Sequence, residues 1–269
     1  MLFSRWLVLA AMTATCGAAA PVSPPVVAVI DSGVARTAEL SGLVLAEYDV
    51  ASVPARTAFQ PKFDHGTMVA TILARAAARQ VRIISFRIDD PGGCPPQLHP
   101  PCQPDPRPVA RAIRQATTLG VRAINLSLSL QDDPDIVAAV REAAREGVAV
   151  VMAAGNHGLN QPDNLSMARA GYPNAVLVGA LGADGRPWAQ TNRPSPDRLP
   201  TCLRSPYRYA WQRGVDVPAA SATGVAVTGT GTSFAAPIET ARLLADGPGA
   251  RVRETTLAEA PQTGTLGGG

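Results

Sequence analysis

Short apolar runs alternate with helical stretches along most of this chain, and this order limits the folds that it can adopt. Apolar runs of about four to eight residues are typical of buried strands, whereas apolar residues three or four positions apart indicate helices. We expect strands at residues 26–30, 81–88, 121–126, 148–153 and 175–181, and helices at 65–79, 108–119, 134–146 and 233–245. Because strands that alternate with helices favour a parallel sheet, the sequence predicts an α/β fold of three layers: a mostly parallel central sheet with helices on both faces.

The ends of the expected helices carry residues that commonly start or stop a helix. Asp64 is expected to cap the helix that begins at His65. Pro134 stands at the start of another helix, and Gly147 follows its end. Pro237 is expected in the first turn of the last helix, where its missing N–H has no intrahelical partner.

Two segments are rich in proline and are expected to be loop or mostly loop. Residues 91–108 contain eight of the 25 prolines, and residues 184–214 are rich in Pro and Arg. Neither segment divides the chain convincingly. We therefore expect one domain over residues 21–250 and a flexible tail over residues 251–269.

The first twenty residues have the layout of a secretory signal. Arg5 precedes an apolar stretch at residues 6–12, and small residues follow as far as Ala20. This stretch is shorter than the ~20 residues that span a bilayer. We expect residues 1–20 to be a signal peptide and the mature protein to be secreted or periplasmic, without a membrane span. Lipid anchoring at Cys16 and a buried N-terminal helix are the alternatives.

The charged residues argue against a nucleic-acid partner. The chain has 24 Lys+Arg and 21 Asp+Glu, a net charge of only +3, and the basic residues are spread along its length. Nucleic-acid-binding domains instead gather positive charge on one face or along one helix.

Cys94 and Cys102 flank a short proline-rich loop. Export to an oxidising compartment favours a disulfide between them. The alternative is a metal site that includes His99, but the usual ligand spacing is lacking. Cys202 is then left without a partner in the sequence.

Four polar side chains stand at the ends of different expected elements. Asp31 directly follows a strand, Asn156 follows another strand through Gly155, and His65 and Ser233 each open a helix. Ligands of parallel sheets bind outside the carboxyl ends of the strands, so these side chains are candidates for one site.

Each of the four residues alone has a simpler interpretation. Asp31 and Asn156 could form turns, His65 could be packed or solvated, and Ser233 could cap its helix. Together they supply a nucleophile, a base, a group that orients the base and a donor for an oxyanion. That combination is the requirement for acyl transfer by an activated serine.

At five places the sequence resembles the subtilisin-like serine proteases, or subtilases. The matching stretches are VVAVIDSGV around Asp31, HGTMVA around His65, INLSLS at 124–129, AAGNHG around Asn156 and GTSFAAP around Ser233. They follow the family's order of Asp, His and Ser and span about residues 26–246. The resemblance implies a subtilisin-like fold and an exported serine endopeptidase that hydrolyses peptide bonds through an acyl-enzyme intermediate.

The resemblance also implies a role for each of these residues. Ser233 would be the nucleophile, His65 its general base, and Asp31 the group that orients His65 and stabilises its cation. The side chain of Asn156 and the backbone N–H of Ser233 would form the oxyanion hole.

Six further residues would bind the substrate by the same resemblance. A substrate in extended conformation would pair with Ser127, Leu128 and Ser129, and the opposite wall of the main specificity pocket would be Ala153, Ala154 and Gly155. An ordinary strand end is the alternative for residues 124–130. Ser129 stands where the family commonly has Gly, and we expect its side chain to favour a medium apolar residue before the cleaved bond.

The sequence also departs from the family. Subtilases usually carry a prodomain, but only residues 21–25 separate the expected signal from the first strand. We therefore expect the chain to fold unaided or with a separate folding or inhibitory partner. No cofactor is expected; family resemblance allows calcium, but no metal site is identifiable.

Other functions are weighed against the endopeptidase. The principal alternative is a non-catalytic peptide-binding protein that retains the subtilase fold. A nucleotide-binding domain is disfavoured because GxGxxG and Walker motifs are absent from the sequence. An α/β-hydrolase esterase is disfavoured because Ser233 lacks the GxSxG elbow.

Overall fold

The computed structural model describes residues 23–95, 101–195 and 206–246. The expected signal peptide with Cys16, His99, Cys202 and the expected tail at 251–269 lie outside the described residues.

Seven strands form one sheet in the order β2-β3-β1-β4-β5-β6-β7, and every neighbouring pair is parallel. The strands are β1 (Val26–Asp31), β2 (Val44–Asp49), β3 (Arg82–Arg87), β4 (Ala123–Leu126), β5 (Ala149–Ala153), β6 (Ala175–Leu181) and β7 (Arg208–Arg213). The sheet is therefore parallel throughout the described chain, and its carboxyl ends all lie at one edge.

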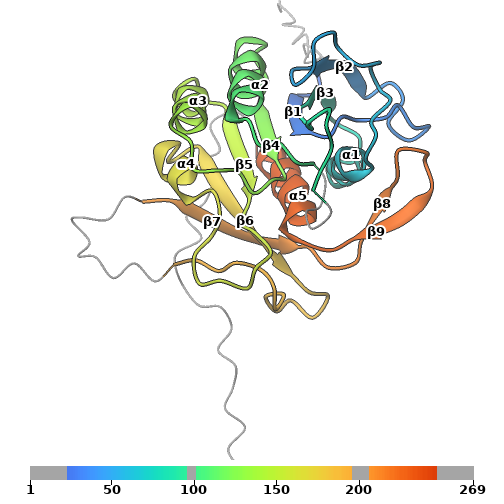
Figure 1. Cartoon of the computed structure of the whole chain (residues 1–269). Coiled ribbons are helices and arrows are strands. Elements are labelled where there is room, and N and C mark those ends of the chain that lie inside the picture. The colour runs from blue at the N-terminus through green and yellow to red at the C-terminus, as the bar shows by residue number, and fades with distance from the viewer. Residues whose placement is uncertain (1–22, 96–100, 196–205, 247–269) are drawn as a thin grey trace, which may run out of the picture.

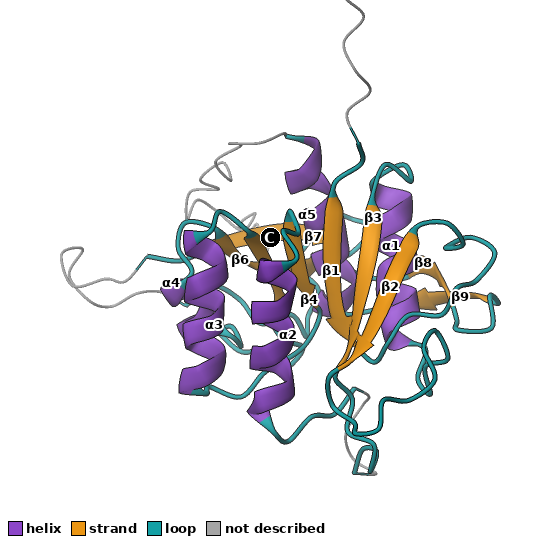
Figure 2. Ribbon diagram, turned by 90° about the horizontal axis from the view of Figure 1, so that it is seen from above, coloured by secondary structure: helices purple, strands orange, loops and turns teal. Residues whose placement is uncertain are grey.

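Helices cover both faces of this sheet, as Figure 1 shows. The helices are α1 (His65–Ala76), α2 (Pro106–Thr118), α3 (Pro134–Arg145), α4 (Leu165–Ala170) and α5 (Thr232–Ala245). The first and last pack on one face and the other three on the opposite face, which the view from above separates (Figure 2). This arrangement confirms the predicted three-layer α/β fold. No helix in the described part of the chain is long and apolar enough to cross a bilayer.

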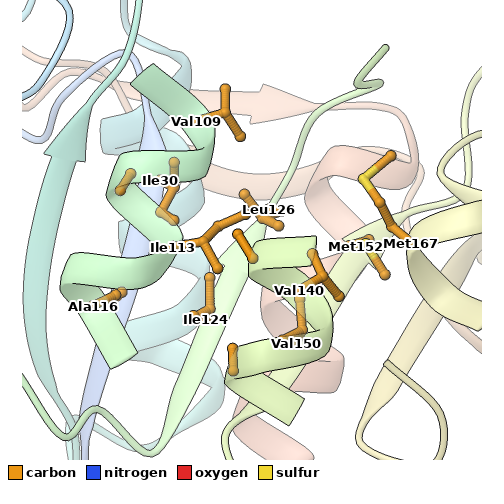
Figure 3. Close-up of a cluster of buried hydrophobic side chains, with 14 of the residues drawn as sticks. Ile30, Val109, Ile113, Ala116, Ile124, Leu126, Val140, Val150, Met152 and Met167 are labelled. Atoms are coloured by element: carbon orange, nitrogen blue, oxygen red, sulfur yellow. The ribbon is translucent and has the colours of Figure 1, made fainter. Parts of the chain in front are cut away.

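The core is built on both sides of the sheet because alternate residues of a strand point to opposite faces. In β1, Ala28 and Ile30 face one layer of helices, while Val27 and Val29 face the other, and all four are fully buried. Figure 3 shows the larger cluster, in which side chains of α2, α3 and α4 meet those of the central strands. Burial on both faces explains why the central strands are continuous apolar runs.

Three details at the helix ends differ from the predictions. Asp64 precedes α1 but does not cap it, because its backbone is already helical (φ −73°, ψ −23°) and its Oδ1 accepts the N–H of Ala222 at 2.8 Å. α1 ends at Ala76, short of residue 79, because Ala78 and Arg79 take positive φ values of 46° and 61°. Pro237 lies inside α5 and not in its first turn, because α5 begins at Thr232.

Several short elements were not predicted. They are β2, α4, β7 within the segment 184–214 that was expected to be mostly loop, and an antiparallel pair formed by β8 (Val217–Ala220) and β9 (Ala226–Gly229). β2 and β7 are the two edges of the sheet and are only partly buried, so they carry polar residues that hide the strand pattern. α2 also begins at Pro106, inside the expected proline-rich loop.

Candidate active site

The carboxyl edge of the sheet brings the four candidate side chains to one place. Asp31 is the last residue of β1, Asn156 follows β5, His65 is the first residue of α1 and Ser233 is the second of α5. His65, Asn156 and Ser233 line one cleft of about 1210 Å³. Asp31 is fully buried against His65.

The carboxylate of Asp31 holds the ring of His65. Nδ1 of His65 lies 2.9 Å from Oδ1 and 3.0 Å from Oδ2 of Asp31, and the His65 side chain keeps 18% exposure. Oδ1 also accepts the N–H of Ser32 at 2.7 Å. A carboxylate on Nδ1 favours the tautomer that carries its proton there, which leaves Nε2 free to accept a proton.

Gly66 allows the start of α1 to approach β1 this closely. A Cβ atom on Gly66 would lie 2.3 Å from the carbonyl oxygen of Gly33 and 3.1 Å from Oδ1 of Asp31. Any larger residue would therefore push His65 away from its carboxylate.

The charge of Asp31 sets the protonation of His65. Burial lowers the pKa of His65, but the negative charge of Asp31 and the hydrogen bond to it raise that pKa, and the net result lies above the ordinary value of 6.5. The imidazole is therefore a stronger base than a free histidine.

The hydroxyl of Ser233 is hydrogen-bonded to Ser127. Oγ of Ser233 donates to the carbonyl oxygen of Ser127 at 2.9 Å, and Oγ of Ser127 donates to the carbonyl oxygen of Ser233 at 2.7 Å. The Ser233 carbonyl is free to accept because Pro237, four residues later in α5, has no N–H. The proline inside the helix thus ties the candidate nucleophile to the strand end at Ser127.

A buried network of hydrogen-bonded polar groups, which was not predicted from the sequence, supports this pair. Nδ2 of Asn125 donates to Oγ of Ser127 at 2.9 Å, and Oγ1 of Thr240 donates to Oδ1 of Asn125 at 3.0 Å. Asn125 and Thr240 are both fully buried. Because buried polar groups need hydrogen-bond partners, this network of hydrogen bonds fixes the position of the Ser127 side chain.

Replacing Asn125 by Ala is expected to lower the free energy of unfolding by about 1–3 kcal/mol, because two buried hydroxyls lose a partner. In a chain of this size each kcal/mol lowers Tm by roughly 2–4 °C. Thermal unfolding followed by circular dichroism measures the change. Asn160→Ala, which removes an exposed asparagine, is the matched control and should leave Tm unchanged. Equal Tm values for the two variants would contradict the role of Asn125.

The side chain of Asn156 is oriented by Thr232, the first residue of α5. Oδ1 of Asn156 accepts the backbone N–H of Thr232 at 2.8 Å and its hydroxyl at 2.9 Å. The amide Nδ2 therefore points the other way, and it has no hydrogen-bond acceptor among the described residues. The N–H of Ser233 belongs to the first turn of α5, whose N–H groups have no intrahelical acceptor. The site thus offers two donors beside the Ser233 hydroxyl.

Comparison with known proteins identifies the family to which a chain with this site belongs. The model of the Subtilase family matches residues 23–245. The chain belongs to the subtilase family. This membership makes it a serine-type endopeptidase, whose substrates are polypeptides. No curated protein matches the chain.

Solved structures share the fold of this subtilase at low sequence identity. Sphericase is 24% identical with a TM-score of 0.67, over 85% of this chain and 79% of that chain. A cold adapted subtilisin-like serine proteinase is 22% identical with a TM-score of 0.63, over 83% and 76%. A mutant of the protease domain of PatA is 24% identical with a TM-score of 0.63, over 81% and 77%.

The expected substrate-binding residues of this subtilase separate into two groups. Ser127, Leu128 and Ser129 line the cleft, whereas the cleft lining does not include Ala153, Ala154 and Gly155, which are buried at the end of β5. Asn164, which was not predicted from the sequence, bridges the two groups. Its Nδ2 donates to the carbonyl oxygens of Leu128 at 2.7 Å and Ala153 at 2.9 Å.

Described residues of the proline-rich segment, within 92–95 and 101–106, also line the cleft. The Sγ atoms of Cys94 and Cys102 are at bonding distance, 2.16 Å, and both residues line the cleft. Among the described residues, no group of three His, Cys, Asp or Glu side chains could hold a metal ion.

Proposed function

We propose that this subtilase is an exported endopeptidase in which Asp31, His65 and Ser233 form the catalytic triad. The observation that carries the proposal is the hydrogen bond that Nδ1 of His65 donates to the buried carboxylate of Asp31, in the cleft that His65 and Ser233 both line. The chain itself supplies the nucleophile, the base and the donors for a developing negative charge.

The first step requires the Ser233 hydroxyl to leave the Ser127 carbonyl. A rotation about χ1 of Ser233 turns Oγ toward Nε2 of His65, which accepts its proton. Oγ then attacks the carbonyl carbon of the peptide bond, and the carbonyl oxygen becomes an oxyanion. The same rotation releases the Ser127 carbonyl, which can accept an N–H of the extended substrate.

The remaining steps return the enzyme to its starting state. Protonated His65 gives its proton to the leaving amine, the C–N bond breaks, and the acyl group stays on Ser233. Water then attacks the ester with His65 as base, and the acid product leaves with the hydroxyl of Ser233 restored. Asp31 stabilises the cationic form of His65 in both halves without taking a proton.

Replacing Asn156 by Ala is expected to lower kcat by about 10²–10³, the magnitude known for the corresponding asparagine of subtilisin, because one of the two oxyanion donors is lost. KM should change little, since the oxyanion forms only in the transition state. Steady-state kinetics on a fluorogenic peptide measure both constants, with Asn160→Ala as the control. A rise in KM with an unchanged kcat would assign Asn156 to substrate binding instead.

Export of the protein rests on two features. The first twenty residues have the order of a secretory signal, and a disulfide such as Cys94–Cys102 persists in oxidising compartments. Fractionation of cells that express the full chain should recover the protein outside the cytoplasm with a shortened N-terminus. An uncleaved cytoplasmic product would refute export and leave the triad untouched.

The test of the triad is labelling by a fluorophosphonate probe, which reacts only with an activated serine. The purified protein should hydrolyse casein and take up one label on Ser233, located by peptide mass spectrometry. Ser233→Ala should take up none and leave casein intact. Binding of casein without hydrolysis or labelling would favour the alternative, a peptide-binding protein that keeps the subtilase fold.

A further inference from the structure

The carboxylate of Asp163 lies between the two strand ends that are expected to form the main specificity pocket. Its Oδ2 accepts the hydroxyl of Ser129 at 2.6 Å. On the other side, a Cβ atom on Gly155 would lie 2.3 Å from the same oxygen. The carboxylate therefore packs directly on the backbone of Gly155 while it holds Ser129 across the gap.

Buried partners fix this position. Oδ1 of Asp163 accepts Nδ2 of Asn192 at 3.0 Å, and Asn192 is fully buried. Oδ1 of Asn192 accepts the N–H groups of His157 and Leu159, both at 3.0 Å, which sets the direction of its amide. The backbone N–H of Asp163 donates to the carbonyl of Ala154 at 2.8 Å. The carboxylate is thus held at both its side chain and its backbone.

Among the described residues, the negative charge of Asp163 has no Lys or Arg partner at ion-pair distance. Its two hydrogen-bonded side-chain partners, Ser129 and Asn192, are neutral. Within the described residues, the basic side chain at ion-pair distance is His157, whose Nε2 is 3.9 Å from Oδ2 and which is 65% exposed. The Asp163 side chain is only 23% exposed, and Ser129 and His157 both line the cleft. Asp163 itself does not line the cleft, but its contact with Ser129 places the carboxylate directly behind the lining, where a cation that displaces the Ser129 hydroxyl gains a charge-assisted hydrogen bond.

We propose that Asp163 makes this subtilase prefer Arg or Lys immediately before the cleaved bond. The assignment rests on the proposed function and replaces the medium apolar residue expected from Ser129 alone. Because the hydroxyl of Ser129 donates to Asp163, a negative charge stands directly behind Ser129. A long cationic side chain of the substrate would lay its apolar stem along the cleft wall at Leu128 and Ser129 and bring its charged end to the carboxylate.

The test compares peptides that differ only in the residue before the cleaved bond: Arg, Leu, Ala or Glu. The natural protein should cleave the Arg peptide with a kcat/KM at least ~10-fold above that of the Leu peptide. Asp163→Asn, which keeps the shape and removes the charge, should lower the Arg-to-Leu ratio by about 10²-fold, as is usual for loss of one partner of a desolvated charge pair. Glu146→Gln, which removes an exposed charge after α3, is the control and should leave the ratio unchanged.

Two further measurements separate this assignment from the proposed function. Binding of the uncleaved Arg and Leu peptides to Ser233→Ala should favour Arg, and adding Asp163→Asn should abolish the difference. A protein that takes no fluorophosphonate label but still binds the Arg peptide through Asp163 would refute the protease mechanism alone. Preference for Leu or Ala, or a ratio that Asp163→Asn does not alter, would overturn the assignment, because the carboxylate would then only fill the pocket.

Discussion

Replacing Ser233 by Ala is expected to lower kcat by about 10⁶, the magnitude established for the triad of subtilisin itself, a member of this family. The variant loses the nucleophile, and only the acceleration of about 10³–10⁴ over water that comes from the oxyanion donors and substrate binding remains. The fold should survive, because the bond from the Ser127 hydroxyl to the carbonyl of residue 233 does not use the lost oxygen. Burst and steady-state kinetics on a fluorogenic ester and a peptide measure the loss.

The matched experiment is the double variant Ser233→Ala with His65→Ala. Because the two residues act as one unit, the double variant should be no slower than Ser233→Ala alone. If kcat of the double variant fell by the product of the two single losses, His65 and Ser233 would act independently. A Ser233→Ala protein that keeps more than a hundredth of the activity would place the nucleophile elsewhere.

Replacing Asp31 by Asn is expected to lower kcat by ~10⁴, as in other serine proteases with this triad. The amide nitrogen would face Nδ1 of His65, which favours the tautomer with the proton on Nε2, where it blocks proton transfer from Ser233. Asp31 thus acts as a positioning residue, through His65. Asp184→Asn, which removes an exposed carboxylate, is the control and should retain full activity.

The pH profile distinguishes this role from a merely structural one. His65 must be neutral to act as a base, so activity rises as the pH increases through its pKa, which in the natural protein lies above 6.5. Asp31→Asn removes the charge that raises this pKa but leaves the burial that lowers it, so the acidic limb should move to lower pH. A loss of activity without a shift of the acidic limb of the pH profile would mean that Asp31 only supports the fold.

The sequence predicted those parts of the fold that rest on local patterns. The central strands are buried on both faces, so β1, β5 and β6 are visible as apolar runs. The edge strands β2 and β7 mix polar with apolar residues and were missed. The cap expected at Asp64 was wrong because its carboxylate has a partner 158 residues later in the chain, the N–H of Ala222.

The residues of the functional site likewise separate into those that were predicted from the sequence and those that were not. Four predicted residues stand at the ends of strands or helices: Asp31, His65, Asn156 and Ser233. Because a parallel sheet brings such ends together, the order of strands and helices along the chain predicts that these side chains lie close to one another. Asp163 and Asn164 act through contacts with Ser129, Gly155 and Leu128 that only the folded chain creates. The hydrogen bond from the Ser233 hydroxyl to the Ser127 carbonyl likewise depends on the side-chain rotamer of Ser233, which no sequence pattern encodes.

A crystal structure of the protein after reaction with a peptidyl phosphonate tests the central claim most directly. We expect a bond from phosphorus to Oγ of Ser233, with the phosphonyl oxygen within about 3.2 Å of both Nδ2 of Asn156 and the N–H of Ser233. The Asp31–His65 pair should stay in place beside it. A phosphonate attached to another residue, or an oxygen that faces away from Asn156, would contradict the account.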